Sequence, residues 1–396
     1  MERETSGLGK VGGLTLAATK AGHPICDLRL AKSRVSIDKS LSIISAPLRA
    51  DASLMPFTPY FDVTEAETLI SFSAIFQGAT PPLVLPDVPA GWTNLFTSPD
   101  MGAFNNAWQL WGREGSNQYA VVIRGTVETV GSIFEDVMAV MIPGSGMLQV
   151  GSVSLDYKLA NDPESAVHLG FALGLFVLLY DAKNGILAKL GALPDGAEVF
   201  ISGHSQGAAI ATLCRSFLEY STTVAAKGFS YKTYVFAQPK PGNDHYGRDF
   251  DRITSNVNLG FRVTNSQDWV PQVPLSLQLL GSLNEPNILD ELTGNFAFKM
   301  FTEGFDALEG HLEEIHLAKH VPQVSALEQI LKSNPSLVLP ASTASAIQLV
   351  PTLNFINCGS SISLPGTPGM NPTDPKDFFW QHHAAMYHGL LTTKFP

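Results

Sequence analysis

The most regular apolar pattern in the chain lies at 199–211 and predicts a strand, a sharp turn and a helix. Val199-Phe200-Ile201 is a β-branched and aromatic run that favours a buried strand. Gly203-His204-Ser205-Gln206-Gly207 follows, and Ala208-Ala209-Ile210-Ala211 then supplies small residues that suit a helix. We therefore expect Ser205 in a tight turn at the carboxyl end of the strand, where the flanking glycines leave room for adjacent chain.

Further apolar runs alternate with helix-competent stretches along the chain. Additional strands are expected at 107–113, 118–123, 231–237, 261–265, 353–356 and 361–364. The first two flank Gly115-Ser116-Asn117 and predict a hairpin. Helices are expected at 69–76 after a capping box at 64–67, at 166–180, from 208 and from 381. This alternation predicts an α/β fold with a mostly parallel central sheet and helices on both faces.

The most apolar stretch, 166–180, is shorter than the roughly 20 residues that a membrane-spanning helix needs. Asn161-Asp162-Pro163-Glu164 precedes it and offers an N-cap and a proline at the first helical position. We expect a buried core helix here and no transmembrane segment.

Two other segments are less regular. Residues 1–60 place short apolar runs between polar and proline-containing breaks, and we treat them as a poorly defined N-terminal extension of one domain covering 1–396. Residues 133–142 are apolar and helix-competent up to a turn at 143–146. Their methionines suit either core packing or a mobile flap that meets irregular apolar ligands.

Residues 276–350 form an insertion with helical character. One apolar stripe recurs at alternating spacings of four and three: Phe301, Phe305, Leu308, Leu312 and Ile315. Pro322 is expected to end this helix. The insertion leaves the sheet just after Asp268 and returns before the strand 353–356. We therefore expect it to form a helical cap over the carboxyl edge of the sheet, where Ser205 and Asp268 are predicted to lie. A helix packed on the back of the core is the alternative.

Charge and composition limit the classes of molecule that the protein is expected to bind. The net charge of −11 argues against nucleic acid and opposes docking on strongly anionic membranes, so neutral substrates fit better. The first 13 residues mix both charge signs and lack the apolar core of a signal peptide. We expect a cytoplasmic location, with secretion as the alternative; the sequence leaves the oligomeric state open.

No cofactor or metal is expected from the cysteines and histidines. Cys26, Cys214 and Cys358 are odd in number and widely spaced, which gives neither a disulfide framework nor a metal-ligand spacing. A cluster at His311, His316 and His320 has no acidic or cysteine partner at a matching spacing.

Candidate chemistry centres on Ser205. A serine hydroxyl needs a base that takes its proton and a third group that orients this base. Asp268 follows the strand 261–265 directly, so its carboxylate is placed at the carboxyl edge of the sheet. His382 and His383 lie between the last strand and the last helix, and residue spacing does not choose between them. The backbone amides of Gln206 and Thr126 are candidate donors to an oxyanion.

Five ordered motifs resemble those of class 3 lipases, which include fungal triacylglycerol lipases and plant acylhydrolases. They are AVVIRGT at 120–126, VHLGF at 167–171, FISGHSQGAA at 200–209, FAQPKPGN at 236–243 and FRVTNSQDWVPQVP at 261–274. The likeness covers roughly 105–275 and 353–390. It implies an α/β-hydrolase fold, a lid at 133–146 and lipid esters as substrates, met at a lipid–water interface.

The resemblance also assigns roles to residues. It implies Ser205 as nucleophile, Asp268 as acid and Thr126 with Gln206 as oxyanion hole. The family's histidine commonly stands five residues before a tyrosine, which matches His382 and Tyr387. The chain departs from the family at Ile123, where phenylalanine is frequent. It also lacks the usual Asp-Trp after Thr126, which leaves the anchoring of the lid open.

The first functional hypothesis is a serine-dependent carboxylic ester hydrolase of the triacylglycerol lipase type that works through an acyl-enzyme intermediate. Phospholipase A1 activity, or hydrolysis of short-chain or feruloyl-type esters, is the alternative within the same chemistry. A hydrolase-like protein that binds lipids or partners without catalysis is the alternative of another class, which the presence of every catalytic residue type weakens.

Overall fold

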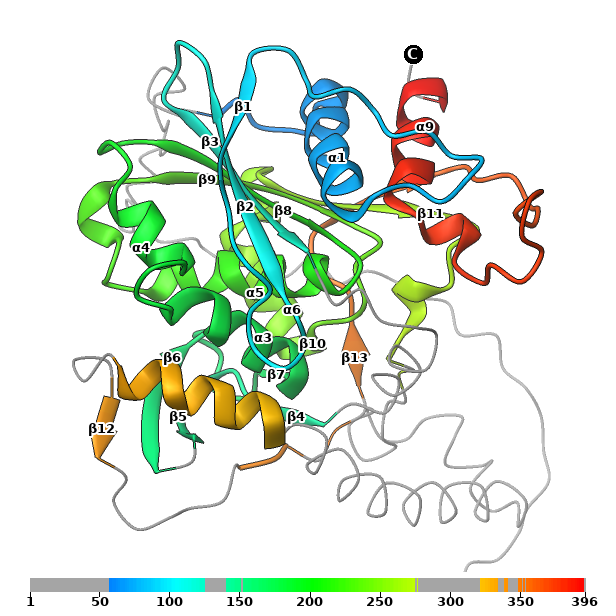
Figure 1. The fold of residues 1–396 in the computed structure, drawn as a ribbon. Coiled ribbons are helices and arrows are strands. Elements are labelled where there is room, and N and C mark those ends of the chain that lie inside the picture. Colours follow the sequence, from blue (N-terminus) through cyan, green and yellow to red (C-terminus); the bar gives the residue numbers. More distant parts are fainter. Residues whose placement is uncertain are drawn as a thin grey trace, which may run out of the picture. The chain divides into compact units, whose positions relative to one another are not determined.

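Seven strands form the central sheet, in the order β1-β2-β3-β8-β9-β11-β14 (Figure 1). The computed structural model describes residues 57–124, 140–150, 152–274, 276, 321–333, 338–340, 348–350, 352 and 354–394. The strands are β1 Trp92–Thr97, β2 Ala107–Arg113, β3 Gln118–Arg124, β8 Glu198–His204, β9 Ser230–Phe236, β11 Gly260–Asn265 and β14 Ser360–Leu364. The last five run parallel, whereas β1 and β2 are antiparallel to their neighbours. The predicted hairpin and mostly parallel sheet are thereby confirmed.

Helices cover both faces of this sheet. Helices α1 (Val63–Gln77) and α9 (Ala384–Lys394) pack together on one face, and α3 (Leu169–Tyr180) and α5 (Gln206–Tyr220) lie on the other (Figure 1). Side chains of β3 alternate accordingly: Ala120 and Val122 join the core beneath α1, whereas Val121 and Ile123 join the core beneath α5. Strand residues buried on both faces explain the continuous apolar runs in the sequence.

Helix α1 begins one residue before the predicted capping box. Asp62 is its N-cap, and its side chain accepts a hydrogen bond from the amide of Glu65. The helix ends at Gly78, as predicted, because Gly78 adopts a φ of 85° that suits glycine. Lys232, fully buried on β9, ties α1 to the sheet through an ion pair of 2.6 Å with Glu65.

The predicted helix at 166–180 is shorter than expected. Residues Ala166–His168 form strand β7, and α3 begins at Leu169 with His168 as N-cap, where Nδ1 accepts from the amide of Gly170 at 3.0 Å. Strand β7 belongs to a second sheet of four strands, with β4 Met141–Pro143, β10 Gly242–Asn243 and β13 Phe355–Ile356. The N-cap pattern at 161–164 predicts a helix start at 166, but the pairing of β7 with distant strands overrides this local preference.

The carboxyl-terminal part of the segment predicted to be a flap forms strands and not a helix. Within 133–146, residues 133–139 lie outside the described residues, and β4 is followed by β5 (Ser145–Val150). Met141 and Ile142 are fully buried and pair with β7, so they serve the core and do not form part of an apolar helix. Strand β5 pairs with β6 (Val153–Lys158), which also pairs with β12 (Val338–Pro340).

Only a small part of the insertion is described. Residues 321–332 are helical, so the predicted helix stop at Pro322 instead lies within a helical segment. Leu327 and Leu331 of this segment are buried in the core that contains α3 and α5, and Gln323 Oε1 accepts from the amide of Ala103 at 2.5 Å. The apolar stripe of Phe301 to Ile315, the histidines at 311, 316 and 320, and Cys26 lie outside the described residues, as does the extension up to residue 56.

Smaller elements complete the described parts. They are helices α4 Ile186–Gly191 and α6 Asp244–Ile253 and the 3-10 turns η2 Ala225–Lys227, η3 Ser255–Val257, η4 Val270–Gln272 and η7 Trp380–His382. Cys214 and Cys358 are buried free thiols. None of the helices in these parts has the length and apolar character that crossing a membrane requires.

Candidate active site

Ser205 occupies the turn between β8 and α5 in a conformation that serine rarely adopts. Its backbone has φ 62° and ψ −136°. Such strain costs on the order of 1–3 kcal/mol and persists only where the surrounding fold imposes it. Glycine is required at 203, because a Cβ there would lie 2.3 Å from the carbonyl oxygen of Gly207. The strand, turn and helix predicted from the sequence therefore form a tight elbow.

A chain of hydrogen bonds joins Ser205 to His382 and Asp268. The Nε2 of His382 lies 2.7 Å from Ser205 Oγ, and its Nδ1 lies 2.8 Å from Asp268 Oδ2. Ser205 and Asp268 follow the carboxyl ends of the parallel strands β8 and β11, and His382 is the last residue of the turn η7. The fold thus brings together groups that are far apart in the sequence. His382 and Asp268 are buried, which shields the hydrogen bond between them from water.

Asp268 accepts two further hydrogen bonds. The amide of Val270 donates to Oδ1 at 2.9 Å, and the hydroxyl of Tyr387 donates to Oδ2 at 2.7 Å. Burial and the adjacent carboxylate raise the pKa of Tyr387, so its phenol keeps the proton that it donates. Sequence reasoning used Tyr387 only as a spacing marker and missed this contact. The position of Tyr387, one turn into the helix that follows the candidate base, is the only sequence feature that could have indicated this contact.

His204 fixes the turn that carries His382, and sequence reasoning missed this contact too. Its Nε2 lies 2.7 Å from the carbonyl oxygen of His382, and the two rings are 4.7 Å apart. Burial lowers the pKa of His204 well below its ordinary value, so the ring is neutral. Since a carbonyl can only accept, Nε2 carries the proton. The residue before the nucleophile thus binds the backbone of the candidate base.

The structure separates the two adjacent histidines. His383 Nε2 lies 2.8 Å from Asp377 Oδ2, which also accepts a hydrogen bond from Asn371 Nδ2. The geometry therefore brings His382 to Ser205 and directs His383 to a different carboxylate.

Of the two residues predicted to form an oxyanion hole, the structure describes Gln206 but not Thr126. Gln206 is the first residue of α5, directly after Ser205, and its side-chain Oε1 accepts from Asn106 Nδ2 at 3.1 Å. Asn106 is fully buried, so it holds the Gln206 side chain in place at the start of the helix. Thr126 lies outside the described residues.

A small apolar cavity lies against the elbow. It has a volume of about 20 Å³, and its lining residues are Phe171, Ser205, Gln206, Pro239, Val270, Val273 and Pro274. Apart from Ser205 and Gln206, the residues that line it are apolar, which suits an apolar substituent on a reacting carbonyl.

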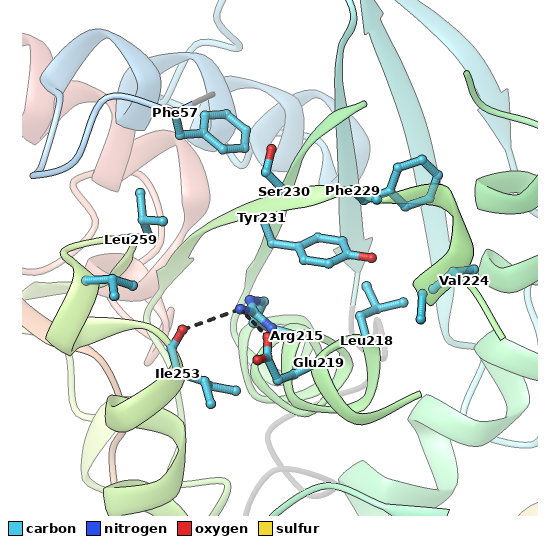
Figure 2. A pocket seen from close by; sticks show the side chains of 13 residues that line it. Phe57, Arg215, Leu218, Glu219, Val224, Phe229, Ser230, Tyr231, Ile253 and Leu259 are labelled. Atoms are coloured by element: carbon cyan, nitrogen blue, oxygen red, sulfur yellow. Dashed lines mark hydrogen bonds and ion pairs between the residues drawn. The ribbon is translucent and has the colours of Figure 1, made fainter. Parts of the chain in front are cut away.

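A second cavity, of about 430 Å³, lies away from this site (Figure 2). Ser230 and Tyr231 line it at the amino end of β9, whereas Ser205 follows the carboxyl end of the parallel strand β8. Figure 2 shows Arg215 beneath the Tyr231 ring, where it forms an ion pair of 2.8 Å with Glu219. None of the three hydrogen-bonded residues lines this cavity, so it does not contribute to the candidate site.

Comparison with known proteins agrees with this geometry. Residues 120–278 match the family model of "Lipase (class 3)". This part of the chain is similar to class 3 lipases. The match contains most of β3, the elbow of Ser205 and the Asp268 loop, whereas His382 lies beyond it. The parallel strand order and the serine elbow are those of the α/β-hydrolase fold.

Curated relatives share only part of their length with this chain. It is 30% identical over 108 residues to the secreted mono- and diacylglycerol lipase 1 of Fusarium solani, which covers 27% of the chain and 29% of the relative. It is 30% identical over 176 residues to phospholipase A1-II 6 of Oryza sativa subsp. japonica, covering 40% and 41%. The chain therefore spans less than half the length of these relatives.

Among solved structures, the mono- and diacylglycerol lipase from Aspergillus oryzae is similar at 19% identity. The similarity covers 55% of the chain and 76% of that structure, with a TM-score of 0.39. At this score the similarity adds no argument to the strand order and the elbow geometry described above.

Proposed function

We propose that this protein is a serine-dependent carboxylic ester hydrolase that acts on lipid esters through an acyl-enzyme intermediate. The observation that carries the proposal is the unbroken chain of hydrogen bonds from Asp268 through His382 to Ser205, with the serine held in a strained elbow. Acyl transfer to a serine requires a base that takes the proton of the nucleophile and an acid that orients this base. Ser205, His382 and Asp268 are placed for these three roles.

The proposed reaction follows from the geometry. Ser205 Oγ attacks the ester carbonyl while its proton moves to His382 Nε2, and Asp268 stabilises the resulting imidazolium through Nδ1. The same proton then passes to the leaving alcohol, which departs as the acyl-enzyme forms. A water molecule, deprotonated by His382, attacks the acyl carbonyl and releases the acid and free Ser205. We assign stabilisation of the oxyanion to the backbone amides of Gln206 and Thr126.

A neutral acylglycerol is the proposed substrate class. The apolar wall formed by Phe171, Val270 and Val273 supports an acyl chain beside Ser205. The Fusarium solani relative is named a mono- and diacylglycerol lipase, which supports acylglycerols as the first candidate substrate. The rice relative is named a phospholipase A1, which makes phospholipid the second candidate. Of the lid expected at 133–146, residues 133–139 lie outside the described residues, as does most of the insertion that is expected to form a cap.

A substrate panel tests this proposal. Soluble p-nitrophenyl esters of increasing chain length would be compared with emulsified diacylglycerol, triacylglycerol and phosphatidylcholine, with release of acid followed by titration. We expect turnover of the soluble esters and, among the emulsions, faster release from acylglycerols. Faster release from phosphatidylcholine would select the phospholipase alternative. No turnover on any substrate, together with binding of the lipids, would select the non-catalytic alternative.

Loss of the Tyr387 hydroxyl should reduce turnover without removing the base. In Tyr387→Phe the Asp268 carboxylate loses one donated hydrogen bond, and hydrogen bonds to charged groups are worth about 1.5–3 kcal/mol. We expect kcat/KM to fall about tenfold or more. The loss should fall on kcat more than on KM, because the hydrogen-bonded Asp268 orients His382 and stabilises the imidazolium that forms during the reaction.

Tyr246→Phe is the matched control for this change. Tyr246 is also a fully buried tyrosine, and its hydroxyl pairs with Ser216 Oγ at 2.9 Å, away from the hydrogen-bonded chain. Both variants should lose some stability, but only Tyr387→Phe should lower kcat. Equal kcat values in the two variants would show that Tyr387 is structural and has no positioning role.

A further inference from the structure

The cavity of about 430 Å³ that lies away from the candidate active site has the properties of a small-molecule site (Figure 2). Its volume falls within the range of ligand pockets. Of the 13 described residues that line it, four have polar side chains: Arg215, Glu219, Ser230 and Tyr231. The other lining residues are apolar or glycine. Apolar walls with a few polar groups are typical of sites that bind and orient an organic molecule.

Arg215 brings to this cavity two hydrogen-bond donors that the described chain leaves unpaired. The residue is only 6% exposed, and its Nη2 donates to the carbonyl oxygen of Ile253 at 3.4 Å and forms the ion pair with Glu219. Its Nε and Nη1 are buried and have no hydrogen-bond partner among the described residues. Buried donors without a partner are unfavourable, above all on a charged group, so an acceptor that reached them would be bound.

Two residues at the start of β9 complete the polar part of the cavity. The guanidinium carbon of Arg215 lies 5.1 Å from the centre of the Tyr231 ring, which holds the arginine against the strand. Burial raises the pKa of Tyr231, so its phenol stays protonated and uncharged. Ser230 Oγ is also buried without a hydrogen-bond partner in the described parts of the chain. The unpaired polar groups therefore gather on one wall, where α5 packs against β9.

The charges at the cavity favour an uncharged ligand. The positive charge of Arg215 is already balanced by Glu219 at 2.8 Å. Helices α5 and α6 both end beside the cavity, at Tyr220 and Ile253, and the C-terminal end of a helix carries a partial negative charge. A carboxylate ligand would have to displace Glu219 and face these two helix ends. A neutral oxygen acceptor meets neither obstacle, because it needs only the donors that are unpaired.

We propose that this cavity is a second binding site, for an uncharged and mostly apolar molecule with an oxygen acceptor, such as an alcohol or a ketone. The oxygen accepts from Arg215, and the carbon chain lies against Leu218 and Phe229. The site is separate from the proposed ester hydrolysis, because the amino end of β9 is the edge of the sheet opposite to that of Ser205. Its test therefore measures binding and needs no catalysis.

Isothermal titration calorimetry of the full-length protein with 1-octanol and with octanoate tests the proposal, since the two probes share a carbon chain and differ in charge. We expect 1-octanol to bind the parent about tenfold more tightly than octanoate. Arg215→Met keeps much of the apolar volume but removes the donors, so it should weaken binding of 1-octanol about tenfold. Glu219→Gln should leave 1-octanol binding unchanged and strengthen that of octanoate, because it removes the competing carboxylate.

Two adjacent alanines in the turn η2 locate the bound probe. Both are exposed, but Ala225 lines the cavity and Ala226 does not. Ala225→Trp should therefore fill the cavity and weaken 1-octanol binding about tenfold or more, whereas Ala226→Trp should bind like the parent. Because Ala225 is exposed, its variant tests the site even if thermal melts show that Arg215→Met is unfolded.

Three results would overturn the proposal. The first is a parent protein that does not bind 1-octanol. The second is binding that either Ala225→Trp or a folded Arg215→Met leaves unchanged, which would place the probe elsewhere on the protein. The third is tighter binding of octanoate than of 1-octanol by the parent, which would assign the cavity to a carboxylate that displaces Glu219.

Discussion

Ser205→Ala should lower kcat on soluble esters by on the order of 10⁴-fold or more, because it removes the atom that forms the acyl-enzyme. A fluorophosphonate probe should label the parent protein at Ser205 and leave the variant unlabelled. Folding should be preserved, since alanine keeps a Cβ and the elbow conformation is imposed by β8 and α5. Peptide mass analysis of the labelled protein and steady-state kinetics would measure both effects.

Ser202→Ala provides the matched control for the nucleophile. Ser202 is fully buried on β8, three residues before Ser205, and its hydroxyl makes no hydrogen bond to another described residue. We expect this variant to keep its activity and its labelling. Labelling at another serine, or substantial turnover by Ser205→Ala, would contradict the proposed mechanism.

His382→Ala should lose activity on the same scale as Ser205→Ala, whereas His383→Ala should stay within about tenfold of the parent. The two residues are adjacent in the sequence, but only His382 contacts Ser205, and His383 instead binds Asp377. His383 is therefore the control that the chain itself supplies, of the same residue type and in the same turn. Parallel kcat/KM measurements on soluble esters would distinguish the variants.

Reversal of these two effects would move the general base to His383. Comparable severe losses in both variants would show instead that the turn η7 collapses when either side chain is removed. Thermal melts would identify that case, because a local collapse beside the α1 and α9 core should lower the melting temperature of both proteins.

Local sequence patterns were sufficient for the parts of the fold that local chemistry determines. The strand, elbow and helix around Ser205 depend on glycines and apolar residues within about ten positions, and the acid after β11 depends on the carboxyl end of a strand. Asp268 could therefore be placed at the correct edge of the sheet. The choice of His382 came from resemblance to a family, since two adjacent histidines carry the same local signal.

Features that depend on distant pairing could not be predicted in this way. Ala166–His168 has helix-competent neighbours, yet it is a strand because β4 and β10 lie on either side of it. The apolar pattern at 133–142 likewise favours a helix or flap, yet Met141 lies in β4, because it pairs with His168 of the distant strand β7. The contacts of Tyr387 with Asp268 and of His204 with the carbonyl of His382 join residues more than 100 positions apart, and no local pattern encodes them.

The bond from His204 to the carbonyl of His382 has a consequence for folding. It joins β8 to a turn 178 positions later, while α9 packs against α1 from the beginning of the described chain. A chain folded only as far as β14 would contain the strained serine but no base. The proposed ester hydrolysis would therefore begin only when η7 and α9 dock, so the time at which activity appears during refolding should report the docking of these two elements.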